Sequence, residues 1–248
     1  MIELAELEIA LRCRLEYARL ADTHTQRSTL EDSWGIVKGR EQILAQWVAQ
    51  GRQEVAIRAD LSDMIAFTVS QGERHWPGHR WVTREHGRIL REIVIEDRGD
   101  ARQAAAGHSP LGELRAGMGQ LPAGGTAILP AGFPEAARPL ANRLHAAWNG
   151  RAFDLDTADW LNSIVTALPD ATFYFERAMV AEDRIALLWR VFGHLNSGRR
   201  IRLIGSGLFT ATPAGEFHCD EMMLDQAAFT AQMTMPMIDY AAPSEGGA

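Results

Sequence analysis

The sequence lacks most of the features that mark a secreted, membrane-spanning or metal-binding protein. Its two cysteines, Cys13 and Cys219, lie in opposite halves without the spacing of a metal site or a disulfide framework. We expect both thiols to be reduced and buried. No stretch approaches the run of about 18 apolar residues that a membrane helix needs, and the acidic N-terminus does not resemble a signal peptide. These absences predict a cytoplasmic protein with no membrane partner.

Excess positive charge is also missing. The 25 lysines and arginines are outnumbered by 32 aspartates and glutamates, which gives a formal net charge of -7. The basic residues are scattered along the chain, so we do not expect nucleic acid as a partner. A hydrophobic fraction of 46% and a charged fraction of 23% are typical of a soluble globular protein. The 248 residues suffice for two domains of about 100–120 residues each.

What the chain does have is one layout that occurs twice, around an Ala/Gly/Pro-rich middle. In each half, helical periodicity is followed by strand-like runs, which begin near residue 54 in the first half and near residue 171 in the second. This order predicts an α+β fold of two cone-shaped barrels, each a curved antiparallel sheet wrapped around its helices. We predict a first barrel over 1–99, a linker over 100–135, a second barrel over 136–240 and a flexible tail over 241–248.

The local patterns predict individual elements. Leucines at steps of three and four indicate one long helix over 2–21, followed by a polar, irregular stretch over 22–37. A short helix over 40–50 precedes the first strands. In the second half, a helix over 139–148 and a helix that Pro169 ends precede strands over 171–179, 184–194, 199–210 and 216–224.

Several segments resemble the nuclear transport factor 2-like superfamily, and in particular its SnoaL-like proteins, which have a cystatin-like cone. In the second half these segments are 144–150, 168–173, 186–194, 201–207 and 220–225; in the first half they are Trp34, 39–43 and 87–89. The superfamily includes polyketide cyclases, ketosteroid isomerases, epoxide hydrolases, dehydratases, carbon–carbon lyases and proteins that only bind or assemble. The resemblance implies that two such cones in one chain pack sheet against sheet, as in a fused dimer.

The enzymes of this superfamily imply chemistry without a cofactor. A carboxylate or an imidazole removes a proton next to a carbonyl or from a hydroxyl, and a hydrogen-bond donor stabilises the oxyanion. We therefore expect no cofactor and no metal. A metal site made of His24, His75 and His79 is a weaker alternative, because Pro77 and Gly78 interrupt the spacing between the last two histidines.

The first half is rich in residues suited to such chemistry. Asp22 and His24 follow the first helix, and His79 and Trp81 share one face of a strand by the period of two. The predicted catalytic residues are Asp22, His24 and His79. The predicted substrate-binding residues are Trp34, Asp63, His75, Trp81 and Glu92. The plainer alternatives are that Asp22 only ends its helix and that the tryptophans belong to the core.

The second half has fewer ionisable residues among its apolar strands, and a purely structural partner is the alternative to a second site. Its candidates are Arg190 and His194, which share one side of a strand, and Asp220, which resembles the strand-end acid of several SnoaL-like enzymes.

Three functions remain open. The first is an acid–base lyase, isomerase or cyclase acting on a small hydrophobic, aromatic or polycyclic compound. Asp22 or His24 would be its base, and His79 or Trp81 would polarise the substrate. Carbon–carbon cleavage that releases a small aldehyde and aldol-type cyclisation are examples of such reactions.

The second possible function is that of a non-catalytic binder that depends on Trp34 and Trp81. The third is an assembly module that could form homo-oligomers through its sheet faces. The histidines, aspartates and tryptophans in one half favour the first function over the third.

Overall fold

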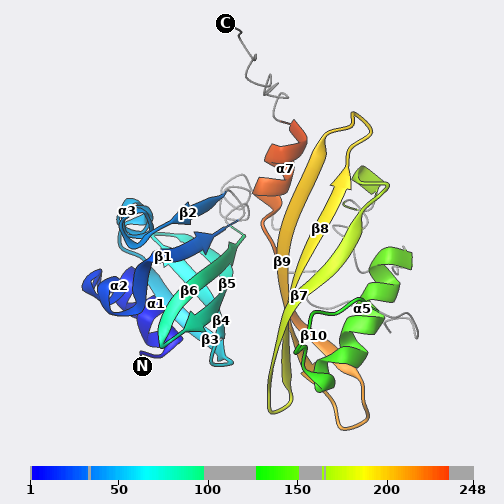
Figure 1. The fold of residues 1–248 in the computed structure, drawn as a ribbon, viewed down its shortest axis with the longest axis horizontal. Helices are drawn as coiled ribbons and strands as arrows, with labels where there is room; N and C mark the ends of the chain where they lie inside the picture. The colour runs from blue at the N-terminus through cyan, green and yellow to red at the C-terminus, as the bar shows by residue number, and fades with distance from the viewer. Residues whose placement is uncertain (1, 33–34, 98–126, 151–163, 165, 235–248) are drawn as a thin grey trace, which may run out of the picture.

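The computed structural model describes residues 2–32, 35–97, 127–150, 164 and 166–234 (Figure 1). Two sheets lie face to face, and helices α1, α2 and α3 flank the first sheet while α5 flanks the second. Both units are therefore α+β, with curved and largely antiparallel sheets, which confirms the predicted fold class. The boundaries between the units stay a prediction, because 98–126 lies outside the described residues. No helix of the described part is long and apolar enough to cross a membrane.

The first unit is a six-stranded sheet in the order β2-β1-β6-β5-β4-β3, in which β1 pairs with β6 in parallel and the other pairs are antiparallel. Its elements, in chain order, are α1 (Leu4–Arg12), α2 (Ala18–Thr23), β1 (His24–Glu31), β2 (Ile36–Lys38), α3 (Arg40–Gln50), β3 (Glu54–Asp60), β4 (Met64–Gln71), β5 (Arg74–Glu85) and β6 (Arg88–Glu96).

The start of the first unit differs from the sequence-based expectation. The predicted helix over 2–21 is two helices, separated by a turn in which Leu15 has a φ of 56°. The predicted irregular stretch contains strand β1. The buried residues of this strand include His24, Ser28 and Glu31, so the apolar–polar alternation that would reveal a half-buried strand is absent.

The second unit is a four-stranded antiparallel sheet in the order β10-β9-β8-β7. Its elements are η2 (Glu135–Ala137), α5 (Arg138–Gly150), β7 (Thr172–Ala181), β8 (Arg184–His194), β9 (Arg200–Ala211), β10 (Phe217–Leu224) and α7 (Gln226–Thr234). The expected strands lie within a few residues of these bounds, whereas α7 was not expected. Most of the helix predicted to end at Pro169 lies outside the described residues.

The two sheets share one apolar cluster, as expected for sheets that pack face to face. The first unit contributes Ala59, Leu61, Met64, Ala66, Trp81, Ile93 and Ile95, and the second contributes Ala186, Leu188, Ile204, Leu208 and Met223. Each unit also has its own core on the opposite side of its sheet, beneath the helices. The strands in the middle of the molecule are therefore buried on both faces.

Gly205 allows a close approach in the second core. It lies opposite Trp189 on the neighbouring strand, and a Cβ at Gly205 would lie 2.0 Å from Cζ2 of the Trp189 indole. The ring centroid of Trp189 is 5.1 Å from that of Trp148 and 6.2 Å from that of Phe173, so the indole is held in place from other sides.

We expect Gly205→Ala to lower the free energy of unfolding by about 3 kcal/mol, because neither the backbone nor the packed indole can yield easily. Urea unfolding measures this change. Gly35→Ala is the matched control, since a Cβ there meets no atom within 4 Å and the φ of Gly35 is not in the left-handed region. Equal stability of the two variants would contradict the packing argument.

Candidate functional site

The interior of the first cone contains a cluster of buried charged side chains. Each of them is at most 5% exposed, although burying a charge is unfavourable unless it is paired. The members of this cluster, named here the cone cluster, are Glu8 and Arg12 from α1, His24 from β1, Arg80 from β5, and Glu92 and Glu96 from β6.

Two guanidinium groups connect the carboxylates of the cone cluster. Arg80 Nε lies 2.7 Å from Glu8 Oε2, and Arg80 Nη1 lies 3.1 Å from Glu92 Oε2. Arg12 donates to Glu8 and Glu96. Arg80 Nη2 is buried and has no hydrogen-bond partner among the described residues. The guanidinium carbon Cζ of Arg80 lies 4.5 Å from the centroid of the Trp47 ring, and Cζ of Arg12 lies 4.9 Å from the same centroid. Both distances are within the range of cation–π attraction.

His24 is held at both ring nitrogens. The Thr23 hydroxyl lies 2.7 Å from Nδ1 and donates to the Arg19 carbonyl at 2.7 Å, while Nε2 contacts Glu92. Because the hydroxyl proton goes to the carbonyl, the Thr23 oxygen accepts from Nδ1–H. The Glu92 carboxylate accepts from Nε2–H, so the contacts fit an imidazolium. With His24 positive, the three carboxylates of the cone cluster are balanced by three cations.

The surroundings favour the ionised forms of Glu92 and Arg12. Burial raises the pKa of Glu92, but the charges of Arg80 and His24 outweigh this effect and lower the pKa below its usual value. Burial lowers the pKa of Arg12, but Glu96 and Glu8 raise it above its usual value. The site thus combines a proton donor, a carboxylate in contact with it and a guanidinium group in a space closed to water.

In its described residues, the second cone differs from the first in the side chains that fill its interior. Its core is built on aromatic rings, with the Trp148 centroid 4.7 Å from Phe173, 5.6 Å from Phe175 and 5.1 Å from Trp189. The same architecture therefore holds an aromatic core in one unit and an ionic cluster in the other.

The structure brings together one predicted catalytic residue, His24, with one predicted substrate-binding residue, Glu92. His24 and Glu92 are in contact inside the first cone. Asp22 is exposed on α2, and His75 is exposed with its Nδ1 2.8 Å from the Ser70 hydroxyl. Trp34 lies outside the described residues.

His79 and Trp81 do share a strand face, but this face points to the second unit and not into the cone. His79 Nδ1 lies 2.8 Å from the Ser206 hydroxyl, and Trp81 Nε1 donates to the same oxygen at 2.9 Å. His79 Nε2 lies 3.2 Å from Glu221 Oε2, which also accepts from Arg58. The intervening residue, Arg80, is the one that reaches the cone cluster.

The remaining predicted residues lie in polar contacts elsewhere. Asp63 accepts from Arg84 at 2.9 Å and from Arg177 of the second unit at 3.0 Å. His194 Nδ1 lies 2.7 Å from the exposed Asp170 carboxylate.

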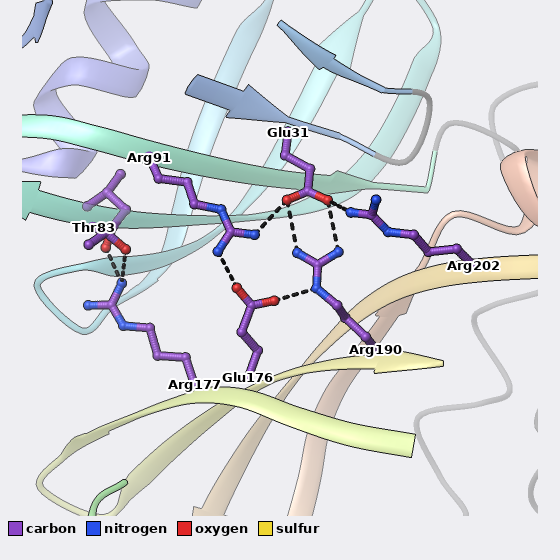
Figure 2. A network of polar contacts seen from close by, with 8 residues as sticks. Glu31, Thr83, Arg91, Glu176, Arg177, Arg190 and Arg202 are labelled. Atoms are coloured by element: carbon purple, nitrogen blue, oxygen red, sulfur yellow. Dashed lines mark hydrogen bonds and ion pairs between the residues drawn. The ribbon is translucent and has the colours of Figure 1, made fainter. Parts of the chain in front are cut away.

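Asp220 is exposed and accepts from the Thr210 hydroxyl at 2.7 Å. Arg190 makes a bidentate contact with Glu31 of the first unit, at 2.8 and 2.9 Å (Figure 2).

The sequence did not predict several members of the cone cluster. Glu8 carries a usable signal, because it interrupts the apolar stripe of Leu4, Leu7 and Leu11 and stands four residues before Arg12. Arg80 and Glu96 carry none, since their orientation depends on the register of strands buried on both faces. In the described residues, no three His, Cys, Asp or Glu side chains are grouped to hold a metal ion.

Comparison with known proteins gives matches at the level of structure. No protein-family model matches the sequence, and no curated protein matches it. An NTF2-like protein from Burkholderia thailandensis E264 is 18% identical, with 56% of this chain and 94% of that chain covered and a TM-score of 0.28. A proposed SnoaL-like polyketide cyclase from Jannaschia sp. CCS1 is 20% identical, with 34% and 64% covered and a TM-score of 0.28. A proposed polyketide cyclase from Bacillus cereus ATCC 10987 is 12% identical, with 47% and 95% covered and a TM-score of 0.34.

The chain is similar to SnoaL-like and NTF2-like proteins. Both names agree with the resemblance that the sequence carries. At these identities and TM-scores the likeness says nothing of activity, so function depends on the residues of this chain alone.

The stability of this chain is expected to depend on pH through Glu221. Burial raises the pKa of this carboxyl, but the charge of His79, its contact with Glu221 and the contacts of Arg58 lower the pKa from 4.5 to about 2. A depressed pKa stabilises the folded state above pH 4.5, and this stabilisation is lost as the pH falls toward 2. A shift of this size corresponds to roughly 3 kcal/mol.

We expect Glu221→Gln to lower the free energy of unfolding at neutral pH by roughly 3 kcal/mol and to flatten its decrease in acid. Urea unfolding over the acid range measures both effects. Asp220→Asn is the matched control on the neighbouring, exposed residue, and it should behave like the parent protein. If the free energy of unfolding decreased in acid equally for Glu221→Gln and for the parent protein, the lowered pKa of Glu221 would be contradicted.

Proposed function

We propose that the chain is a cofactor-independent acid–base enzyme for a small hydrophobic compound and that its active site is the cone cluster. The observation that carries this proposal is the contrast between the two cones. One has six buried ionisable groups, and the other has an aromatic core in its described part. Perturbed, buried ionisable groups that contact one another are a common property of active sites.

Stability alone does not explain the cone cluster. Replacing a buried ion pair by apolar residues of similar volume is often neutral or stabilising. In its described part, the second cone accommodates Trp148, Phe173 and Trp189 without such a cluster. Burying the charged groups of the cone cluster does not favour stability. Their contact with one another therefore indicates a chemical role rather than a structural one.

The contacts assign a role to each central group. His24 is the proton donor, Glu92 stabilises its imidazolium form, and the Thr23 hydroxyl fixes the orientation of the ring. A substrate oxygen that gains negative charge would be stabilised by Arg80, whose Nη2 has no hydrogen-bond partner among the described residues. The carboxylate of Glu8 is the base next to that guanidinium group.

This arrangement fits reactions that begin with proton transfer next to a carbonyl or from a hydroxyl. Isomerisation, aldol-type cyclisation and carbon–carbon cleavage with release of a small aldehyde share this first step. Because the cone cluster is closed to water, entry of the substrate requires the elements that cover the cluster to move. Predicted catalytic residues outside the cone cluster, Asp22 and His79, have no direct role in this mechanism.

Hydrogen–deuterium exchange tests the proposal without a known product. The protein is incubated in D2O with a panel of aromatic ketones, phenolic diols and polycyclic diketones, and loss of the proton signal next to the carbonyl is followed by NMR. For the diols, release of aldehyde is measured. We expect His24→Gln and Glu92→Gln to slow the reaction by about a hundredfold or more, as for loss of general acid–base catalysis.

His194→Gln is the matched control, because this histidine also contacts a carboxylate but is exposed in the second unit. It should leave the rate unchanged, and unfolding curves should show that all variants are folded. If no member of the panel reacts, or if the two cone variants react like the parent, the proposal is wrong. Binding of a panel member without any reaction would favour the alternative of a non-catalytic binder.

A further inference from the structure

A groove between the two units has a charge pattern that the cone cluster does not explain. Its volume is about 440 Å³, within the range of small-molecule sites. Three arginines surround two carboxylates in it (Figure 2). The charged residues are Glu31 and Arg91 from the first unit and Glu176, Arg190 and Arg202 from the second. Arg91 precedes Glu92 on β6, and adjacent residues of a strand point to opposite faces, so this groove is separate from the cone.

The arginines of the groove differ in how many of their N–H donors already have an acceptor. Arg190 donates through Nε to Glu176 at 2.5 Å and through both Nη atoms to Glu31. Arg91 donates to both carboxylates. The Arg202 side chain is 48% exposed, and its contact with Glu31 involves only Nη2. A guanidinium group has five N–H donors, so Arg202 can bind a further acceptor in the groove.

The charges of the groove do not cancel. Three guanidinium groups and two carboxylates leave one positive charge. Both carboxylates are held by arginines, and for Glu31 burial is outweighed by contacts from Arg190, Arg91 and Arg202 that lower its pKa to about 2. Asp32 lines the adjoining smaller hollow, where its carboxylate accepts from Gln46 and from the Gly35 N–H. One monoanion would neutralise the groove, whereas a dianion would reverse its charge.

The groove also has an apolar wall. Phe192 from β8 and Ile36 from β2 line it beside the arginines. Ile36 is 57% exposed, so its side chain is accessible to a ligand in the groove. A flat apolar body against Phe192 and Ile36, with an anionic group toward Arg202, matches both parts of the lining.

We infer that this groove is a second ligand site, which binds a small aromatic monocarboxylate with its carboxylate on Arg202 and its ring on Phe192 and Ile36. This site goes beyond the proposed reaction in the cone. The carboxylate and the guanidinium group form charge-assisted hydrogen bonds that suit the planar geometry of both groups.

A purely structural role for these ion pairs is the competing explanation. Asp63, Arg84 and Arg177 form such a contact elsewhere between the units, where Arg177 also donates to the Val82 carbonyl. This contact also has one excess positive charge, but its residues do not line the 440 Å³ groove. It therefore provides a control for the effect of removing an inter-unit arginine.

Titration calorimetry of the full chain with 2-naphthoate and benzoate, compared with 2-naphthamide and benzamide, tests the site. We expect the carboxylates to bind and the neutral amides to bind at least about tenfold more weakly, as for loss of a charged hydrogen bond. Arg202→Met should weaken binding of 2-naphthoate by about tenfold or more. Arg177→Met should bind it like the parent, since it removes an inter-unit arginine outside the groove.

A further variant distinguishes a ligand site from a purely structural set of ion pairs. Glu31→Gln removes a resident carboxylate, so 2-naphthoate should bind more tightly, whereas a structural contact predicts unchanged or lost binding. His24→Gln should bind 2-naphthoate like the parent, which makes failure here distinguishable from failure of the proposed reaction. The inference is wrong if 2-naphthoate does not bind, if the amides bind equally well, or if Arg202→Met binds like the parent.

Discussion

Burial of β5 and β6 on both faces is the constraint on which the rest of this structure depends. One face of these strands closes the first cone, and the other packs against the second unit. Residues 78–82 and 92–96 are all buried as a result. Water is therefore not available to any polar group on these stretches, and each such group must find a partner inside the protein.

The alternation of side chains along these two strands divides the polar groups into two sets. Arg80 and Glu92 point into the first cone and join the cone cluster, whereas His79, Trp81 and Arg91 point toward the second unit. Because both sets stand on the same strands, a shift of the inter-unit contact would also move the backbone that carries the cone cluster. The second unit can thus position the proposed catalytic groups without contributing one of them.

The sequence was sufficient for the fold class and for some local features. Strands of the second unit follow from periodicity, and the placement of His79 and Trp81 on one strand face follows from the period of two. The sequence does not show whether this face points into the cone or toward the second unit. Strands that are buried on both sides lose the apolar–polar alternation that would indicate the solvent side. Strand β1 was missed because His24 and Ser28 take buried positions where an apolar residue would have indicated a strand.

Polar contacts around the shared apolar cluster set how the two sheets meet. Apolar packing is largely non-directional, so the cluster between the sheets favours contact but does not by itself fix one register. Hydrogen bonds do fix it, because the bidentate pair of Arg190 with Glu31 and the pair of Arg58 with Glu221 each require one relative position. Removing one partner would leave the other charge buried and unpaired, which is more unfavourable than the pair is favourable. The relative position of the sheets is therefore specified more sharply than the area of apolar contact would suggest.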